Sequence, residues 1–247
     1  MTTGRLLTED ERHLLVGVDT PTVCNVIELF DVRPRNAGYM DRRIQACFPD
    51  LPPMVGYAST ATFRSNAPPR SSDVYASLDA QVGRFQEIPG PPVVVFQDLD
   101  DPPVSATFGE VMCTAYRAFG AVGLITSGAG RDLQQVKSIS FPCFTSSTIC
   151  SHGYCHIPET HVPVHVGGIT IYPGDLLHGD CNGVTTIPLE IARGVARACA
   201  ELIEAEQELL DYLRSPVPTV NGFGQHREAM TLRFQELGQR IKRGEFA

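Results

Sequence analysis

Apolar and polar positions along the chain predict short buried strands separated by helices. Val55–Phe63 alternates apolar with small residues, and Val93–Phe96 is an unbroken β-branched and aromatic run typical of a strand buried on both faces. Gly109–Phe119 carries its apolar residues at i, i+3, i+4 and i+7, which predicts a helix, and Val122–Thr126 predicts another short strand. Strand, helix and strand in this order predict a right-handed βαβ unit with parallel strands.

Helical patterns are predicted at both ends of the chain. The first 35 residues are predicted to be helical, and Pro188 is predicted to open the longest helix. Residues 216–225 are predicted to be a linker rich in Pro and Gly, and residues 226–247 a short, slightly basic amphipathic tail. We therefore predict one domain over residues 1–215, with the linker and tail following it.

Weaker patterns predict the remaining elements. They comprise a helix at 73–85, strands at 139–144, 162–166, 169–171 and 184–187, and turns at 172–175 and 179–183.

Composition narrows the classes of protein. The 247 residues are 43% hydrophobic and 19% charged, which is enough apolar material for a sizeable core and excludes low-complexity disorder. A formal net charge of −8 makes nucleic acid an unfavourable partner. No apolar window is long enough to span a membrane and the amino terminus lacks the core of a signal peptide, so a cytoplasmic location is expected. The eight cysteines form no CxxC pair and are expected to be free thiols.

The βαβ unit predicts where ligands bind. The loops 108–110 and 127–132 are expected to meet at the carboxyl edge of the parallel strands, where open α/β sheets place ligands. The first-turn amides of the helix can hold a carboxylate, and Arg131 offers a planar fork to a carboxylate or enolate. Asp132 and Glu110 are hard oxygen ligands suited to Mg²⁺ or Mn²⁺. The alternative is an ordinary surface ion pair beside a helix N-terminus.

Several motifs resemble one known family. Gly109-Glu110, followed after twenty residues by Arg131-Asp132, resembles the signature of the RraA-like proteins. That family includes the class II 4-hydroxy-4-methyl-2-oxoglutarate / 4-carboxy-4-hydroxy-2-oxoadipate aldolases. The resemblance covers about residues 15–215. Other similar motifs, in the same order, are Val55-Gly56-Tyr57-Ala58-Ser59-Thr60, Ala118-Phe119-Gly120-Ala121-Val122-Gly123, Phe141-Pro142-Cys143-Phe144, Pro173-Gly174-Asp175, Gly179-Asp180, Gly183-Val184 and Ile187-Pro188.

The resemblance implies a fold, an assembly and a chemistry. The fold would be an α/β/β/α sandwich of the swivelling-domain type, assembled as homotrimers or homohexamers. The chemistry would be retro-aldol cleavage to pyruvate, with decarboxylation of oxaloacetate as a side activity. Backbone amides of Gly109, Glu110, Val111 and Met112 would hold the substrate carboxylate. Arg131 would bind the substrate and stabilise the enolate, and Asp132 would bind Mg²⁺ or Mn²⁺.

The chain departs from the family pattern in places. Ser127-Gly128 stands where Asp-Gly is usual, and Gly130 replaces a common Val or Leu. Glu110 stands where the aldolases have Asp, which makes a role as base or water-orienting group less secure. The family also includes proteins that inhibit an RNA-degrading endonuclease, so a non-catalytic regulator that binds a ribonuclease or another protein is the alternative function.

Two histidine pairs offer further candidates. His152 and His156 lie four residues apart beside Cys155 and would face a zinc ion or the substrate if helical, but Gly153 opposes a rigid helix. A closer RraA-like subgroup has a similar S-H-x-Y-x-H run, which implies a substrate-side role, and a surface role is the alternative. His161 and His165 flank a strand-like sequence and are predicted to face outward.

Charged segments have simpler interpretations. Asp98, Asp100 and Asp101 are predicted to form a solvated acidic loop, with added charge around a metal as the alternative. The glutamates near residues 201–208 are predicted to be a solvated face, and the basic residues of the tail are predicted to contact another subunit.

Together these features predict a divalent-metal-dependent lyase that acts on a small anionic 2-oxo acid. Since the net charge of −8 cannot attract an anion, the site must supply positive potential locally. Arg131, a helix N-terminus and a bound cation are the sources that the sequence offers.

Overall fold

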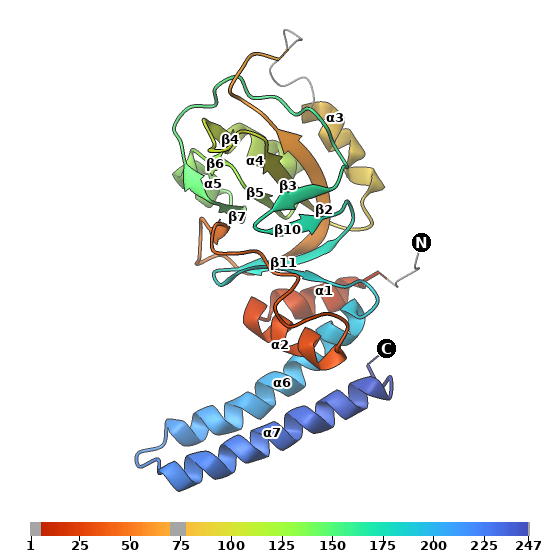
Figure 1. The fold of residues 1–247 in the computed structure, drawn as a ribbon, viewed down its shortest axis with the longest axis vertical. Coiled ribbons are helices and arrows are strands. Elements are labelled where there is room, and N and C mark those ends of the chain that lie inside the picture. The colour runs from red at the N-terminus through yellow and green to blue at the C-terminus, as the bar shows by residue number, and fades with distance from the viewer. Residues whose placement is uncertain (1–5, 70–77, 247) are drawn as a thin grey trace. The chain divides into compact units, whose positions relative to one another are not determined.

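The computed structural model describes residues 6–69 and 78–246, and its contacts divide the chain into two units (Figure 1). One unit spans residues 38–188, and the other combines the two ends of the chain, residues 1–37 and 189–247. The predicted domain boundary at residue 215 stays a prediction.

A seven-stranded mixed sheet forms the centre of the 38–188 unit. Its order is β1 (Gln45–Ala46), β7 (Cys143–Thr145), β5 (Gly123–Thr126), β3 (Pro92–Asp98), β2 (Met54–Phe63), β11 (Leu176–Asp180) and β12 (Gly183–Ile187). Strands β2, β3, β5 and β7 are parallel to their neighbours in this group, whereas β1, β11 and β12 pair antiparallel. The predicted α/β class and the parallel βαβ unit are confirmed.

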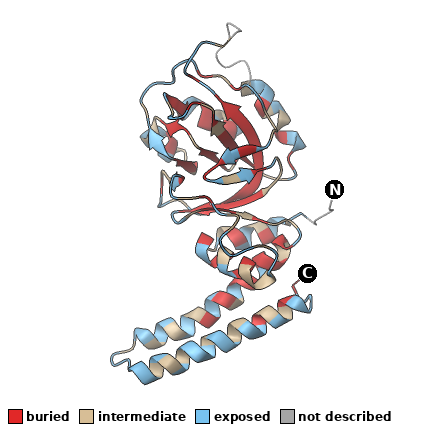
Figure 2. Cartoon of the chain, viewed as in Figure 1, coloured by how far each residue is buried: buried red, intermediate tan, exposed pale blue. Residues whose placement is uncertain are grey.

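The segment Val93–Phe96 of strand β3 is apolar because both faces of the strand are covered. Val94 and Phe96 belong to one hydrophobic cluster, and Val93 and Val95 to another. In Figure 2 the strands of the central sheet are coloured mostly as buried. Helix α4 (Glu110–Ala118) contributes to the first cluster through Tyr116, whose hydroxyl donates to Gln81 Oε1 at 2.7 Å. The hairpin of β9 (Val164–Val166) and β10 (Ile169–Ile171) contributes to the second cluster. Each buried side chain of this size stabilises the fold by about 1.5–3 kcal/mol.

A small parallel sheet carries the loops that follow the central strands. It consists of β4 (Ala106–Phe108), β6 (Ala129–Gly130) and β8 (Ser147–Thr148). Phe108 lies opposite Gly130, and a Cβ on that glycine would come within 2.3 Å of the Phe108 ring. Gly130 therefore stands where the family often has Val or Leu because the Phe108 ring fills the space.

Some predicted elements are placed differently. Residues predicted to begin a strand at 139 follow helix α5 (Leu133–Ser138), and the strand covers only Cys143–Thr145. Gly179 and Asp180, predicted to be a turn, end strand β11. The predicted helix 73–85 is present as α3 (Leu78–Gly83) and the 3₁₀ turn η1 (Arg84–Glu87), and its first residues lie outside the described part.

The other unit is helical. Its helices are α1 (Glu9–Val16), α2 (Thr20–Phe30), α6 (Ala192–Leu213) and α7 (Val220–Lys242). The predicted linker over 216–225 is wrong from residue 220 onward, because those residues belong to α7, which is longer than α6. The Thr219 hydroxyl accepts from the Gly222 amide at 3.1 Å, and this N-cap starts the helix despite its glycines.

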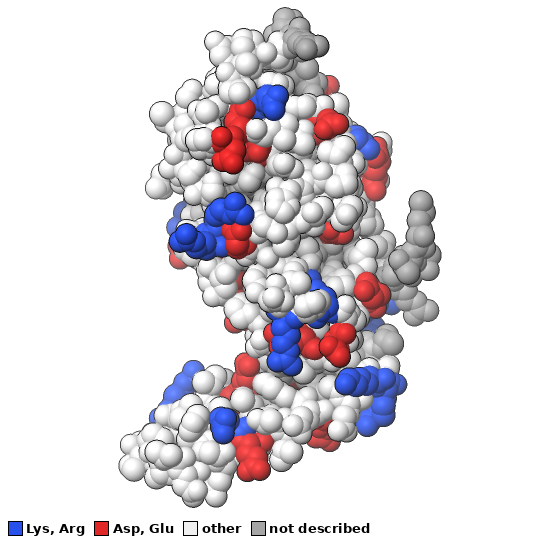
Figure 3. Space-filling view, viewed as in Figure 1, with Lys and Arg blue, Asp and Glu red and all other residues white. Residues whose placement is uncertain are grey.

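Charge pairs join α6 and α7. Arg233 pairs with Glu208, and Arg240 pairs with Glu201. On the face of the molecule drawn in Figure 3, basic side chains lie beside acidic ones. Arg233 and Arg240 therefore have partners within the chain. Contact of the basic tail residues with another subunit stays a prediction.

Two absences concern the described residues. None of their helices is long and apolar enough to cross a membrane. The eight cysteines, all of them within the described ranges, form no disulfide, as predicted, although Sγ of Cys113 lies 3.9 Å from Sγ of Cys143.

Candidate functional site

The two loops predicted to meet do meet at the start of α4. The Arg131 amide donates to the Phe108 carbonyl at 3.0 Å, which extends the β4–β6 pairing by one step. This bond places Arg131-Asp132 beside Gly109, the N-cap residue of α4. The meeting of these loops is confirmed, and the roles of their side chains stay predictions.

Asp132 joins the two loops through its side chain. Its carboxylate Oδ2 accepts from the Glu110 amide at 3.1 Å and lies 3.6 Å from Arg131 Nε. Asp132 is the N-cap residue of α5, yet its side chain does not cap that helix. Its backbone is left-handed, with φ of 55°, a conformation that Asp tolerates better than most residues. The strained backbone directs the carboxylate to the neighbouring helix, which is typical of functional positions.

The first turn of α4 offers amides to an anion. The amides of Val111 and Met112 have no acceptor within the helix, and the helix dipole places positive potential there. The Glu110 amide, which the resemblance assigns to the substrate, donates to Asp132 instead. The Val111 and Met112 amides therefore remain available to an anion, and their binding of a substrate stays a prediction.

A pocket opens beside this turn. Its volume is about 290 Å³, and Arg131 is the one lysine or arginine among the described residues that line it. The lining residues are Leu78, Ala106, Thr107, Phe108, Gly109, Val111, Met112, Arg131, His152 and Cys155. Of these residues, the sequence motif includes Gly109 and Arg131, and the resemblance adds the backbone of Val111 and Met112. The motif gives no signal for Leu78 or Cys155, which belong to other segments of the chain.

The oxygen donors near Arg131 fit Mg²⁺ better than zinc. Among the described residues, no three His, Cys, Asp or Glu side chains are grouped to hold a metal, which excludes a closed zinc site there. The Asp132 side chain is 37% exposed. Magnesium keeps several waters and is commonly held through one or two carboxylates together with substrate oxygens. One accessible carboxylate fits such a site, and metal binding by Asp132 stays a prediction.

The histidine run is not helical: residues 153–154 form a turn, and His156 pairs with a neighbouring strand segment. His156 exchanges backbone hydrogen bonds with Arg64, at 3.0 and 3.1 Å, so the helical alternative for residues 152–156 is wrong. His152 lines the pocket and its Nδ1 lies 2.9 Å from the Gly153 carbonyl oxygen, whereas His156 is absent from the described lining. A substrate-side role stays a prediction for both residues.

The acidic segment at the end of β3 was predicted to be solvated, but most of it is buried. Asp98 and Asp100 are 8% and 6% exposed, and only Asp101 faces solvent. Asp100 Oδ2 accepts from the Ser65 and Asn66 amides at 2.7 and 3.0 Å. Such hydrogen bonds compensate the burial of this carboxylate, and they could not be foreseen from the sequence because Ser65 lies 35 positions away.

Asp98 is buried with less compensation. Its Oδ1 accepts from the Asp100 amide at 3.0 Å, but its Oδ2 makes no hydrogen bond. Burial, together with the Asp100 charge, raises the pKa of Asp98 to about 6. Its Oδ2 and Thr107 Oγ1 lie 2.5 and 2.1 Å from the position that a Cβ on Gly128 would take. The Asp98 amide also donates to Ser127 Oγ at 2.9 Å, so Asp98 contacts the loop that carries Arg131.

Replacing Asp98 with asparagine is expected to stabilise the protein at neutral pH. The folded-state pKa lies above the unfolded value of 3.8, so the contribution of Asp98 to stability is full below pH 3.8 and is lost as the pH rises to about 6. The asparagine side chain keeps the acceptor for the Asp100 amide and carries no charge that burial would penalise. The advantage of the variant in unfolding free energy should grow by about 2 kcal/mol between pH 4 and pH 7.

Urea unfolding of both proteins at several pH values measures this difference. The exposed neighbour Asp101→Asn provides the matched control and should show no such growth. A difference between Asp98→Asn and the parent protein that is independent of pH would show that Asp98 titrates normally.

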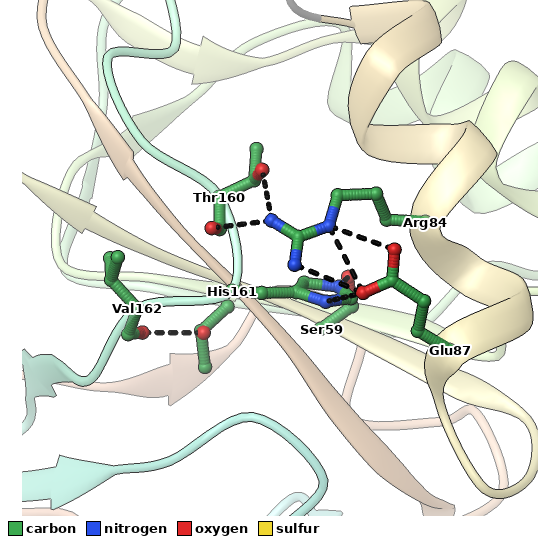
Figure 4. A network of polar contacts seen from close by, with 7 residues as sticks. Ser59, Arg84, Glu87, Thr160, His161 and Val162 are labelled. Atoms are coloured by element: carbon green, nitrogen blue, oxygen red, sulfur yellow. Dashed lines mark hydrogen bonds and ion pairs between the residues drawn. The ribbon is translucent and has the colours of Figure 1, made fainter.

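His161 was predicted to face outward and does not. Its side chain is only 5% exposed, and it lies between Ser59 and Glu87, with Nε2 3.2 Å from Ser59 Oγ and Nδ1 3.2 Å from Glu87 Oε2 (Figure 4). Burial and the nearby Arg84 lower the pKa of His161. Ser59 is fully buried on β2, so the order Ser–His–Glu does not present an accessible nucleophile. His165, by contrast, is exposed as predicted.

This network attaches segment 160–162 to the edge of β2. Arg84 donates to the Thr160 carbonyl at 2.9 Å, and Thr60 Oγ1 donates to the Val162 carbonyl at 2.6 Å. The contacts join backbone segments, and none of these residues belongs to the described lining of the pocket beside α4.

Sequence comparison connects the chain to known proteins. A sequence model of the RraA-like family, described as Aldolase/RraA, matches residues 20–186. A protein of Halalkalibacterium halodurans, named as a candidate 4-hydroxy-4-methyl-2-oxoglutarate aldolase, is 34% identical over 119 residues. The match covers 48% of this chain and 54% of that protein, so the chain spans about half the length of this relative.

Structural comparison supports the same fold. An uncharacterized protein of Pseudomonas syringae superposes with a TM-score of 0.71 at 20% identity, over 92% of this chain and 97% of that chain. RraAS2 of Streptomyces coelicolor, described as an unusual member of the RNase ES inhibitor RraA protein family, superposes with a TM-score of 0.64 at 20% identity, over 81% of this chain and 96% of its own. At such identities the likeness establishes the fold alone.

Proposed function

Because the chain belongs to the RraA-like family, we propose that it is a lyase that cleaves or decarboxylates a small anionic 2-oxo acid through a pyruvate enolate. The relative named as a candidate aldolase supports lyase chemistry. The observation that carries the proposal is the convergence of Arg131, Asp132 and the first turn of α4 beside a pocket of about 290 Å³.

Each part has a role that follows from its chemistry. The amides of Val111 and Met112 bind the substrate carboxylate, whose charge the helix dipole favours. Arg131, whose side chain is 30% exposed, donates to the 2-oxo oxygen and stabilises the negative charge that develops there as the enolate forms. Asp132 keeps Arg131 beside Gly109 through the 3.6 Å contact. Glu110 lies at the rim, exposed to solvent, where it can orient a water molecule.

A divalent cation is part of the proposal. Mg²⁺ or Mn²⁺, held by Asp132, would supply a Lewis acid next to the substrate oxygens. The cation would also offset the net charge of −8, which otherwise opposes the approach of an anionic substrate.

Exchange of pyruvate methyl protons in D₂O tests the proposal without knowledge of the natural substrate. With Mg²⁺ present, the protein is expected to catalyse the exchange, because enolate formation makes these protons labile. Proton NMR follows the loss of the methyl signal. Chelation of the metal and Asp132→Asn should each reduce the rate at least tenfold, whereas Asp50→Asn, which changes an exposed carboxylate elsewhere, should not.

Absence of exchange with every divalent metal tried would contradict the enzyme. The alternative, a regulator that binds a ribonuclease or another protein, would then be favoured. The expected homotrimer or homohexamer and the cytoplasmic location stay predictions.

A further inference from the structure

The pocket beside α4 is lined mainly by apolar side chains. They include Leu78, Phe108, Val111, Met112 and Cys155. Arg131 lies beside Gly109, where the carboxylate and the 2-oxo group of the substrate would bind. Phe108 and Met112 are 1% and 8% exposed, so they are anchored in the hydrophobic cluster under the helix.

The apolar side chains of the pocket suit no second carboxylate. Arg131 is the one lysine or arginine among the described lining residues, and Asp132 already lies 3.6 Å from it. A further carboxylate placed against Phe108 and Met112 would lose its hydration and would meet no second lysine or arginine among the described lining residues, which disfavours its binding. An apolar group placed there would instead displace water from apolar surface and bind favourably.

We propose that the substrate is a 4-hydroxy-2-oxo acid whose C4 carries an uncharged apolar group, an aryl or branched alkyl chain, that packs against these apolar side chains. The inference rests on the proposed lyase function and deepens it. In the reaction, the C3–C4 bond breaks and its electron pair passes to C3, which gives the pyruvate enolate. The C4 hydroxyl loses its proton to water and becomes the carbonyl of an apolar aldehyde, and C3 takes a proton from water to give pyruvate.

The size of the pocket agrees with such a group. An apolar protein cavity of about 150 Å³ binds benzene. The pocket here has about 290 Å³, which leaves comparable room for the four-carbon oxo acid part beside Arg131.

Two substrates distinguish the alternatives. Racemic 4-hydroxy-2-oxo-4-phenylbutanoate carries an aryl group at C4, and 4-hydroxy-2-oxoglutarate carries a carboxylate there. Proton NMR measures pyruvate release from each with Mg²⁺. The value of kcat/KM for the phenyl substrate should exceed that for the dicarboxylate at least tenfold. Equal or faster cleavage of the dicarboxylate would overturn the inference.

The pyruvate exchange assay separates this inference from the lyase proposal. Exchange without cleavage of the phenyl substrate would contradict the apolar substrate class while the lyase chemistry stands. Loss of both exchange and cleavage would contradict the lyase proposal itself, and the substrate class with it.

A charge introduced at the pocket gives an independent test. Val111 lines the pocket and is 78% exposed, so Val111→Lys places a cation there without burying it. The ratio of kcat/KM values should shift at least tenfold toward the dicarboxylate. Phe119→Lys is the matched control, because this residue is 64% exposed at the other end of α4 and its substitution should leave the ratio unchanged. An unchanged ratio in Val111→Lys would show that the C4 group lies elsewhere.

Discussion

Replacing Arg131 with alanine is expected to lower the rate of enolate formation by about 10³-fold, because loss of a single donor to a developing oxyanion has effects of this size. The Arg131 side chain lines the pocket next to Gly109, and no other lysine or arginine among the described lining residues can replace its charge. The rate of pyruvate methyl exchange in D₂O measures the loss. Stability should change little, because the side chain is 30% exposed and its backbone bond to Phe108 remains.

Two further variants identify the cause. Arg131→Lys keeps the charge but loses the planar fork, and should recover only part of the rate. Arg117→Ala removes an exposed arginine from the opposite end of α4 and should leave the rate unchanged. Full activity in Arg131→Ala would exclude this residue from enolate stabilisation and favour the ordinary surface ion pair weighed from the sequence.

The central strands could be predicted because their patterns are local. The Val93–Phe96 run of β3 is apolar on both faces, and β2 alternates large with small residues, so each pattern indicates burial directly. The meeting of Gly109 with Arg131-Asp132 could also be predicted, since the βαβ geometry brings the ends of parallel strands to one edge.

Other features depend on partners that are distant in the sequence. Strand β11 is short and interrupted in pattern by His178 and Gly179, yet it is fully buried because it pairs with β2 and β12. Asp98 and His161 look like surface residues in sequence, and their burial follows from segments that fold over them.

Helix α7 and the lining of the pocket also depend on residues that are distant in the sequence. Gly222 and Gly224 disfavour helix by propensity, but packing against α6 and the Thr219 cap outweigh them. The apolar lining of the pocket combines Leu78 and Cys155 with α4 residues, and no sequence pattern connects these positions. The part of the site proposed to bind the anion was therefore predictable from a motif, whereas the apolar lining was not.

Replacing Gly109 with alanine is expected to lower the exchange rate by about 10²-fold, because a small displacement of catalytic groups can cost this much. The added Cβ would lie 2.6 Å from Asp132 Oδ2 and 3.0 Å from Arg131 Nε, so both side chains must move away. The backbone at this position is extended, with φ of −158°, and accepts alanine without strain. The loss should therefore come from the displaced charges.

The two effects can be separated by measuring exchange and unfolding on the same variant. The free energy of unfolding should fall by less than about 1 kcal/mol, since the displaced side chains are partly exposed and can turn into solvent. Gly83→Ala is the matched control, because no atom lies within 4 Å of its added Cβ and it should keep the full exchange rate. If Gly109→Ala also kept the full rate, the close approach of Arg131 and Asp132 to the start of α4 would not be needed for enolate formation.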